Sequence, residues 1–481
     1  MVGENVNNTL SPTPPPREGA IDAQLTQLTP SFEGGCRRRE RVLLTNKRVN
    51  MKIKELIEAT NAKVIKPIDE NLDVKISTDT RTIKDGDFYL PLKGASFDGE
   101  KFINQALEKG AVGAFCTKDG GNLQVTDTLT AYLELANYRR KKLNFKVVAI
   151  TGSSGKTTTK ELVASTLSEK FKTFKTPLNH NNEIGFCQTI FETPDDTEVL
   201  VLEMGMRGLG EIELLSKYSE PDITIISNVG TAHIGRLGSR ENIAKAKCEI
   251  VKYQRGNVFI AHDDELIKKT VEFNGEKIFY SIKDVDILEK SAHYSKFKYK
   301  NEIFELNVGG DYNIENALAA INAGLKLGMD FEEIKRGLKK YAPIEKRWEA
   351  TQAGGYEIIN DSYNANPESM RAFVDTIFEL YDKYALVLGD MGELGENEVH
   401  YHKELGEYIN NHKKLVQDTT VITIGELSKN ISDAITNCNS MHFDNIEDAI
   451  NYIKSNIKPE YKLFLKASRS MKFERIIELL A

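Results

Sequence analysis

A glycine-rich loop between an apolar strand and a helix is the feature that most constrains what this chain can fold into. The loop reads Thr151-Gly152-Ser153-Ser154-Gly155-Lys156-Thr157, and it joins a strand predicted at Lys146–Ile150 to a helix predicted at Thr158–Phe171. Glycines let backbone N–H groups face a polyphosphate, and the helix N-terminus adds positive potential. A lysine and a threonine at these positions typically reach the β/γ-phosphates and Mg²⁺. The flanking elements favour a phosphate-binding loop over a glycine-rich turn with a lone lysine.

Strand–helix alternation continues through most of the 481 residues. At roughly 150 residues per domain the length predicts about three domains. Short, unalternating β-branched runs at Val199–Leu202 and Ile223–Ile226 are typical of buried parallel strands. The predicted fold class is α/β, with a small mixed α/β domain, a central parallel sheet carrying the phosphate loop, and a C-terminal Rossmann-like doubly wound unit. The predicted bounds are 51–142, 143–346 and 347–481, with a hinge near Arg347.

The first 50 residues differ from the rest of the chain. They hold five of the 13 prolines and show neither a helical nor a strand period, which predicts a disordered extension. No apolar run precedes a small-residue cleavage site, so a signal peptide is not expected. Every motif considered below lies after Met51, so we expect the extension to be dispensable for activity.

Charge and cysteine content exclude several classes of protein. The chain has 64 Lys and Arg against 71 Asp and Glu, a net charge of −7, which disfavours binding of nucleic acid through its phosphates. No apolar run approaches the roughly 18 residues that span a bilayer, so membrane insertion is not expected. The five cysteines are widely spaced and form no CxxC, which indicates a reduced, cytoplasmic protein without a disulfide framework or structural zinc.

The residues that follow the next strands carry the remaining chemistry. Ligands of open parallel sheets gather at the carboxyl ends of strands. The strand Val199–Leu202 leads into Glu203, and Ile223–Ile226 leads toward His233. A carboxylate and an imidazole here are candidate Mg²⁺ ligands, although His233 by itself would also suit a hydrogen-bonding loop role. Lys247 shares a helix face with Ile243 and Ile250, where a lysine rarely lies without a partner, unless it snorkels to the surface.

Taken together, these motifs resemble the Mur ligases, the ATP-dependent amide-forming enzymes of peptidoglycan assembly. The resemblance rests on the phosphate loop, Glu203-Met204-Gly205, Ala232-His233 and Ala244–Lys247. It is extended by Asn179–Gly185, Asp361–Pro367, Leu388–Gly395 and Lys466–Arg469, and it covers Met51–Ala481. The resemblance implies a ligase that activates a carboxylate with ATP as an acyl phosphate. Its implied substrates are UDP-N-acetylmuramoyl-tripeptide and D-alanyl-D-alanine, and a monomer is expected.

The resemblance also implies roles for individual residues. Lys156, Lys247, His233 and Glu203 match catalytic positions, and Thr157, Glu203, His233 and Lys247 match ligands of two Mg²⁺ ions, with Lys247 carbamylated. ATP-contacting positions are matched by Gly152, Ser153, Ser154, Gly155, Lys156, Thr157, Thr158, Asn316, Arg347 and Asp361. Substrate-contacting positions are matched by Ser77, Thr78, Asp79, Arg81, Asn179, Asn181, Asn182, Ser362, Tyr363, Asn364 and Asn366, the first four at the UDP end.

Two alternatives remain open on the sequence alone. One is a different amide ligase on the same scaffold, such as a folylpolyglutamate-synthetase-like enzyme or the ligase that adds the third peptide residue. The latter usually carries an Asp-Asn-Pro-Arg motif, which is absent here. The other is a P-loop NTPase that switches partner binding without forming a bond. The sequence does not distinguish lysine from meso-diaminopimelate in the tripeptide.

Overall fold

Three six-stranded sheets organise the chain in this computed structural model, which describes residues 50–481 apart from 95–96, 178–179, 292, 344–345 and 417. Each sheet lies within one of the predicted domains 51–142, 143–346 and 347–481, whose bounds remain predictions. The predicted disordered extension, except for residue 50, and the predicted site residue Asn179 lie outside the described residues.

The first sheet is mixed. Its parallel centre is flanked by antiparallel edge strands in the order β1 (Met51–Lys52), β3 (Asp73–Ser77), β4 (Asp87–Tyr89), β5 (Gly113–Cys116), β6 (Leu123–Gln124) and β2 (Lys63–Val64). The accompanying helices are α1 (Ile53–Thr60), α2 (Ile103–Glu108) and α3 (Thr128–Leu143). The buried Arg140 of α3 donates to the carbonyl oxygen of Ser219 at 2.7 Å, at the end of a central helix. This contact ties α3 to the next sheet.

The central sheet is wholly parallel and carries the phosphate loop. Its order is β12 (Glu276–Tyr280), β11 (Val258–His262), β10 (Ile223–Ile226), β7 (Lys146–Thr151), β9 (Val199–Glu203) and β8 (Thr173–Lys175). Strand β7 lies between β9 and β10. The phosphate loop after β7 therefore lies beside the residues that follow β9 and β10, as predicted from the strand ends.

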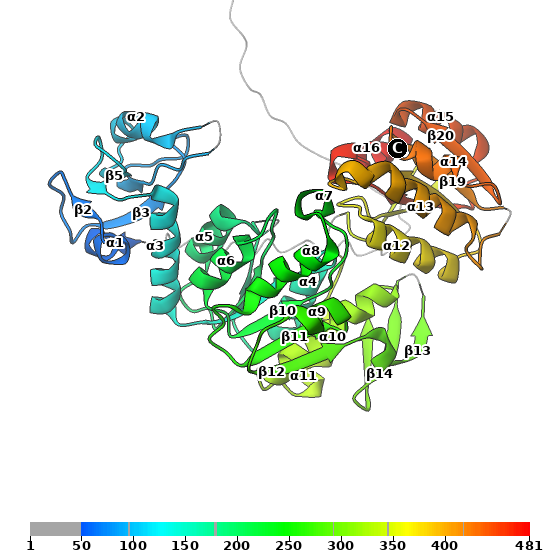
Figure 1. Ribbon diagram of the computed structural model, residues 1–481, viewed down its shortest axis with the longest axis horizontal. Coiled ribbons are helices and arrows are strands. Elements are labelled where there is room, and N and C mark those ends of the chain that lie inside the picture. The colour runs from blue at the N-terminus through cyan, green and yellow to red at the C-terminus, as the bar shows by residue number, and fades with distance from the viewer. Residues whose placement is uncertain (1–49, 95–96, 178–179, 292, 344–345, 417) are drawn as a thin grey trace, which may run out of the picture. The chain divides into compact units, whose positions relative to one another are not determined.

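Helices cover both faces of this sheet because β7 is apolar on both sides. Val148 and Ile150 pack toward α4 (Lys156–Leu167) and α10 (Asp311–Lys326). Val147 and Ala149 pack toward the opposite layer, which contains α5 (Glu183–Glu192), α6 (Glu211–Ser219) and α8 (Arg240–Cys248). Figure 1 shows the helices on either side of the green strands. The continuous apolar run of β7 thus reflects burial on both faces.

A small antiparallel sheet extends the central region. It consists of β13 (Asp286–Lys290), β14 (Ser295–Tyr299) and β15 (Glu302–Leu306), and α11 (Phe331–Lys340) packs beside it, with Phe331 against Phe304 at 6.2 Å. The sequence analysis does not predict this sheet. Strand β13 is exposed over most of its length, so it lacks the buried apolar run by which the other strands were predicted.

The C-terminal sheet is parallel except for its first edge strand. Its order is β16 (Glu349–Ala353), β17 (Tyr356–Asn360), β21 (Lys462–Lys466), β18 (Tyr384–Gly389), β19 (Thr420–Ile424) and β20 (Asn439–Phe443). Its helices are α12 (Pro367–Leu380), α13 (Glu398–Asn410), α14 (Lys429–Asp433), α15 (Ile446–Asn456) and α16 (Glu474–Leu480). The predicted α/β class with a doubly wound C-terminal unit is confirmed.

The border between the central and C-terminal sheets is apolar. Trp348 is 4% exposed, and its ring packs against Tyr312 of α10, Phe373 of α12 and Phe464 of β21, with centroids 5.7–6.2 Å apart. Lys346 and Trp348 have φ of 60° and 56°, in the left-handed region that side chains seldom adopt. The chain therefore turns sharply on both sides of Arg347.

No helix in the described part of the chain is both long enough and apolar enough to cross a membrane.

Candidate active site

A cavity of about 780 Å³ collects most of the predicted site residues. It lies at the carboxyl ends of the central strands and is also lined by residues of the C-terminal sheet region. The predicted residues that line it are Ser153, Ser154, Gly155, Lys156, Thr157, Thr158, Asn181, Asn182, Glu203, His233, Lys247, Asn316, Arg347, Asp361, Tyr363, Asn364 and Asn366.

Gly155 closes the phosphate loop and begins helix α4. It adopts φ +76°, and a Cβ added there would lie 2.6 Å from Asn316 Oδ1, which accepts a hydrogen bond from the Thr159 hydroxyl at 3.0 Å. Both the left-handed backbone and the close approach of Asn316 call for glycine. The predicted Asn316 thus supports the loop from α10.

Asn228 supports the opposite side of the phosphate loop. Its Oδ1 accepts hydrogen bonds from the amides of Ser153 and Ser154 at 3.1 and 2.9 Å, and its Nδ2 donates to the Ser154 carbonyl at 3.2 Å. The sequence analysis assigned Asn228 no role. Its position two residues after β10, beside the phosphate-loop strand, was the available signal.

Lys156 folds back over its own loop. Its Nζ donates to the Gly152 carbonyl oxygen at 2.9 Å. Burial in the cavity lowers the pKa of Lys156, and the positive charge of Arg347 lowers it further, while Glu203 and Glu393 oppose the shift. The ammonium group is therefore held where a bound anion would stabilise its charge.

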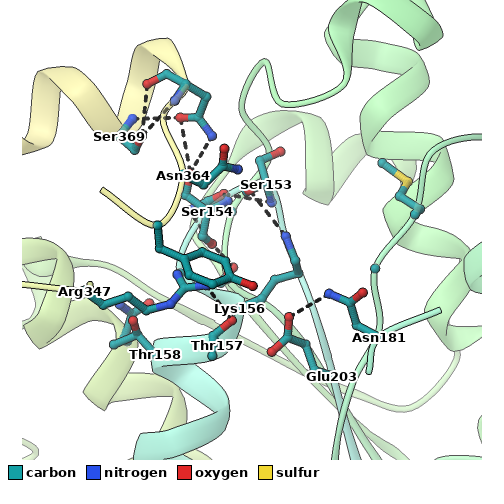
Figure 2. Close-up of a pocket in the computed structure, with 18 of the residues that line it drawn as sticks. Ser153, Ser154, Lys156, Thr157, Thr158, Asn181, Glu203, Arg347, Asn364 and Ser369 are labelled. Carbon is teal, nitrogen blue, oxygen red and sulfur yellow. Dashed lines mark hydrogen bonds between the residues drawn. The ribbon is translucent and has the colours of Figure 1, made fainter. Parts of the chain in front are cut away.

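Glu203 ends β9 with its carboxylate in the cavity. It is 3% exposed, and its Oε1 accepts a hydrogen bond from Asn181 Nδ2 at 3.0 Å (Figure 2). Oε2 is buried without a hydrogen-bond partner in the described structure, and the nearest ammonium, Lys160 Nζ, lies 3.9 Å away. A buried carboxylate oxygen that accepts no hydrogen bond is costly and suits a hard cation.

Lys247 lies on the inner face of α8 and is 1% exposed. Burial lowers its pKa well below that of an ordinary lysine, and the charge of Lys156 adds to the effect. No carboxylate pairs with its Nζ among the residues that the structure describes. The predicted inward orientation of Lys247 is confirmed. The alternative, in which its ammonium group extends to the surface, does not fit a side chain that is almost fully buried.

His233 has its ring at the cavity wall and its Nδ1 lies 2.6 Å from Glu393 Oε2, which the sequence analysis did not connect with the site. This contact with His233 lowers the pKa of Glu393. Within the described ranges, no three His, Cys, Asp or Glu side chains gather closely enough to hold a metal by themselves. A metal here would need ligands of other kinds, such as the Thr157 hydroxyl, phosphate or water.

Arg347 reaches the phosphate loop from the border of the C-terminal sheet. Its Nη2 donates to the Thr157 hydroxyl at 3.0 Å, and its guanidinium stacks on the Tyr363 ring at 4.0 Å. Figure 2 shows Arg347 pointing toward Thr157. Asp361 forms an ion pair with Lys466 and accepts from the Trp348 amide at 3.2 Å. Arg347 therefore contacts the loop, and Asp361 lines the same cavity.

Two predicted asparagines have capping roles as well. Asn182 caps α5 by accepting from the Gly185 amide at 2.9 Å. Asn366 caps α12 by accepting from the Ser369 amide at 2.9 Å, and its Nδ2 donates to the Ser154 hydroxyl at 2.9 Å. Asn366 therefore links the C-terminal sheet region to the phosphate loop.

The remaining predicted residues do not line the cavity. Gly152 of the loop accepts from Lys156 Nζ through its carbonyl oxygen, and the buried Ser362 donates its hydroxyl to Asn360 Oδ1 at 2.6 Å. Ser77, Thr78, Asp79 and Arg81 lie at and after the end of β3 in the first sheet, and the Arg81 guanidinium lowers the pKa of Asp79 to about 2. Asn179 is outside the described residues. Their roles remain predictions.

Three family models match the chain. They are the Mur ligase family catalytic domain at residues 75–149, the Mur ligase middle domain at 150–324, and the Mur ligase glutamate ligase domain at 346–469. The chain is similar to the UDP-N-acetylmuramoyl-tripeptide–D-alanyl-D-alanine ligase of Bacillus subtilis, at 36% identity over 84% of this chain and 92% of the relative. The Escherichia coli enzyme of the same name is 29% identical over 90% and 98%.

Solved structures agree with these relatives. A crystal structure of MurF from Acinetobacter baumannii superposes with a TM-score of 0.81 at 28% identity, covering 90% of this chain and 99% of that chain. The MurF ligase of Thermotoga maritima in complex with ADP gives a TM-score of 0.76 at 28% identity, covering 86% and 98%. The sequence matches, the shared three-sheet fold and the site around the phosphate loop agree with the predicted resemblance, and the chain belongs to the Mur ligase family.

Proposed function

We infer that this chain is an ATP-dependent ligase that joins D-alanyl-D-alanine to UDP-N-acetylmuramoyl-tripeptide. The relatives that it matches over most of their length carry that name. The observation that carries the inference is one cavity in which the phosphate loop meets Arg347 and Asp361. An ATP site that is completed by the C-terminal sheet region suits an enzyme that must bring a third reactant to an activated carboxylate.

The chemistry follows from the poor reactivity of a carboxylate. A carboxylate oxygen of the tripeptide attacks the γ-phosphorus of ATP, the bond to the β-phosphate oxygen breaks, and ADP leaves. The acyl phosphate that forms has a good leaving group. The amine of D-alanyl-D-alanine then attacks the carbonyl carbon, loses a proton, and inorganic phosphate leaves as the amide forms. The sum is one ATP converted to ADP and phosphate for each peptide bond, with the carboxylate oxygen leaving in the phosphate.

Phosphoryl transfer requires charge neutralisation and alignment more than covalent help from the protein. The proposed roles are anion binding by Lys156 and the amides of Ser153–Thr158, and γ-phosphate contact by Arg347. Lys156 Nζ donates to the Gly152 carbonyl oxygen of its own loop, so it is placed to transfer to a phosphate oxygen over a short distance. Asn316 is the proposed adenine-side residue, because it lies on α10 against the loop.

Magnesium fits the donors present. Oε2 of Glu203, which accepts no hydrogen bond in the described structure, and the Thr157 hydroxyl are oxygen ligands of the kind that Mg²⁺ prefers. His233 and a carbamate on Lys247 would complete the protein ligands of two ions. When bound, Mg²⁺ neutralises charge on the phosphate oxygens. The proposed carbamate forms when the neutral Nζ of Lys247 bonds to the carbon of CO₂ and releases a proton, and the lowered pKa of Lys247 favours that neutral amine.

The proposed substrate contacts are divided among the three regions. Ser77, Thr78, Asp79 and Arg81 hold the UDP end, Asn179, Asn181 and Asn182 approach the muramoyl-peptide, and Ser362, Tyr363, Asn364 and Asn366 serve the C-terminal side. Asn181 supports this division, because its amide contacts Glu203 at the cavity wall. We further propose a monomer that acts in the cytoplasm, where the four described cysteines would remain as free thiols.

The test is phosphate release by the full chain with ATP, UDP-N-acetylmuramoyl-tripeptide and D-alanyl-D-alanine. We expect release only when all three are present, with either the lysine or the meso-diaminopimelate tripeptide. Glutamate and diamino acids serve as alternative acceptors, and their preferential use would favour another ligase of the family. ATP hydrolysis at the same rate with and without each acceptor would favour the P-loop NTPase that switches partner binding, and it would contradict the inference.

A further inference from the structure

The loop Met391–Asn397 after β18 contacts the short helix α7 (Ile234–Leu237) of the central region. The Gly235 amide donates to the Glu393 carbonyl oxygen at 3.2 Å. A Cβ on Gly235 would lie 2.5 Å from Gly395 N, and a Cβ on Gly395 would lie 2.6 Å from Gly235 Cα. The two backbones therefore approach so closely that a side chain at either position would separate them.

His402 of α13 holds the Met391–Asn397 loop in place through hydrogen bonds. This imidazole is fully buried, accepts from the Met391 amide through Nε2 at 2.9 Å, and donates through Nδ1 to the Glu398 carbonyl oxygen at 2.7 Å. Leu394 adds a buried apolar anchor at 1% exposure. The backbone around Glu393 is thus held by His402 at Met391 and by Gly235 at the Glu393 carbonyl oxygen. Glu393 itself adopts φ +62°.

Glu393 contacts His233 through the ring nitrogen Nδ1. Its Oε2 lies 2.6 Å from Nδ1, and His233 lines the cavity although Glu393 does not. The two atoms are close but not aligned as a hydrogen bond, because Nδ1 has no hydrogen-bond partner in the described structure. A carboxylate this close to Nδ1 electrostatically favours a proton on Nδ1 over one on Nε2, which keeps the Nε2 lone pair available. A metal-binding histidine commonly has such a carboxylate on its other nitrogen, which sets the ring orientation.

We propose that Glu393 is a positioning residue, through which docking of the Met391–Asn397 loop on α7 sets the orientation of His233 in the nucleotide site. The proposal rests on the proposed function, because it assigns His233 to the metal side of that site. It makes one site residue of the central region depend on a side chain 160 positions away, supplied from the C-terminal sheet region. Docking of the C-terminal sheet region would then be coupled to the orientation of His233 in the nucleotide site.

Two substitutions of Glu393 distinguish the role of its carboxylate oxygen from the role of its side-chain size. Glu393→Ala removes the partner of Nδ1 and should lower kcat about 10- to 100-fold, the range for loss of a ligand's supporting partner. Glu393→Gln keeps an oxygen that can accept from Nδ1, so its kcat should fall clearly less than that of Glu393→Ala. KM for the UDP-substrate should stay unchanged in both, because the residues proposed to hold its UDP end belong to the first sheet region and include neither Glu393 nor His233. Glu396→Gln is the matched control, since Glu396 is an exposed carboxylate on the same loop and should behave as wild type.

Two further readouts do not depend on ligase activity. Titration of Mn²⁺ in the presence of ADP, followed by electron paramagnetic resonance, should show about 10-fold weaker binding in Glu393→Ala. Hydrogen exchange should be faster in the peptide containing Gly235 for Gly395→Ala, which breaks the backbone contact. In that variant Mn²⁺ binding should weaken as it does in Glu393→Ala.

The outcomes separate this proposal from the proposed function. Wild-type Mn²⁺ affinity in Glu393→Ala, or an equal loss in Glu396→Gln, would overturn the positioning role even if the enzyme is the expected ligase. Absence of ligase activity in the wild-type chain would overturn the proposed function, while the Mn²⁺ and exchange measurements would still decide whether docking orients His233.

Discussion

The steric demand on Gly155 gives a quantitative prediction for Gly155→Ala. Alanine in the left-handed backbone of this position costs about 1 kcal/mol. Its Cβ would also lie 2.6 Å from Asn316 Oδ1 and displace the hydrogen bond from Thr159, leaving a buried hydroxyl unpaired at a cost of about 2 kcal/mol. The expected destabilisation is about 3 kcal/mol in total. For a domain of this size that corresponds to a fall in melting temperature of about 9 °C.

Gly328→Ala is the matched control. Gly328 has φ +81° and no atom within 4 Å of its added Cβ, so only the backbone cost applies. Its melting temperature should fall by about 3 °C. Thermal unfolding measures both variants, and calorimetric titration with ADP should show weaker binding for Gly155→Ala only. In an Asn316→Ala background, Gly155→Ala should cost no more than Gly328→Ala does, since the clash is gone. Equal melting temperatures for the two single variants would refute the steric argument.

Three other predictions concern the carbamate, a buried histidine and the N-terminal extension. Lys247→Ala should abolish ligation, and short carboxylic acids should partly restore it by replacing the carbamate; full activity without them would contradict the assignment. Burial lowers the pKa of His402, so its contribution to stability is complete above the unfolded imidazole's pKa of about 6.5 and is lost as the pH falls through the folded-state pKa. Melting curves of His402→Gln should accordingly be less sensitive to acid than those of the wild type. A chain that begins at Met51 should retain the ligase rate of the full chain, and a large loss of rate would show that the first 50 residues take part in catalysis.

Helices and strands were predicted well where the residues that determine them, buried apolar side chains and capping residues, are neighbours in the sequence. Strand β10 is an uninterrupted run of buried β-branched residues, and it was predicted with its observed bounds, Ile223–Ile226. The sequence likewise predicts a helix at Pro367–Leu380, the observed bounds of α12, where Asn366 caps the helix and Pro367 occupies its first turn. Continuous apolar runs and helix caps are properties of neighbouring residues, so one sequence is enough to detect them.

Contacts between distant segments were beyond such reasoning. Asn228 follows β10 in the sequence, but its hydrogen bonds to the phosphate-loop amides depend on the strand order. The partner of His233 lies on another sheet region altogether, and no local pattern marks Glu393 as that partner. Strand ends therefore indicated which residues reach the site but not which side chains support them.

The apolar border around Trp348 has a practical consequence. This is the only tryptophan in the chain, and it lies between Tyr312 of the central region and Phe373 and Phe464 of the C-terminal region. Tryptophan emission shifts to longer wavelength as the indole becomes hydrated. The native protein thus carries a single built-in optical reporter one residue from Arg347, and any rearrangement that wets this border during a catalytic cycle can be followed in real time without attaching a dye.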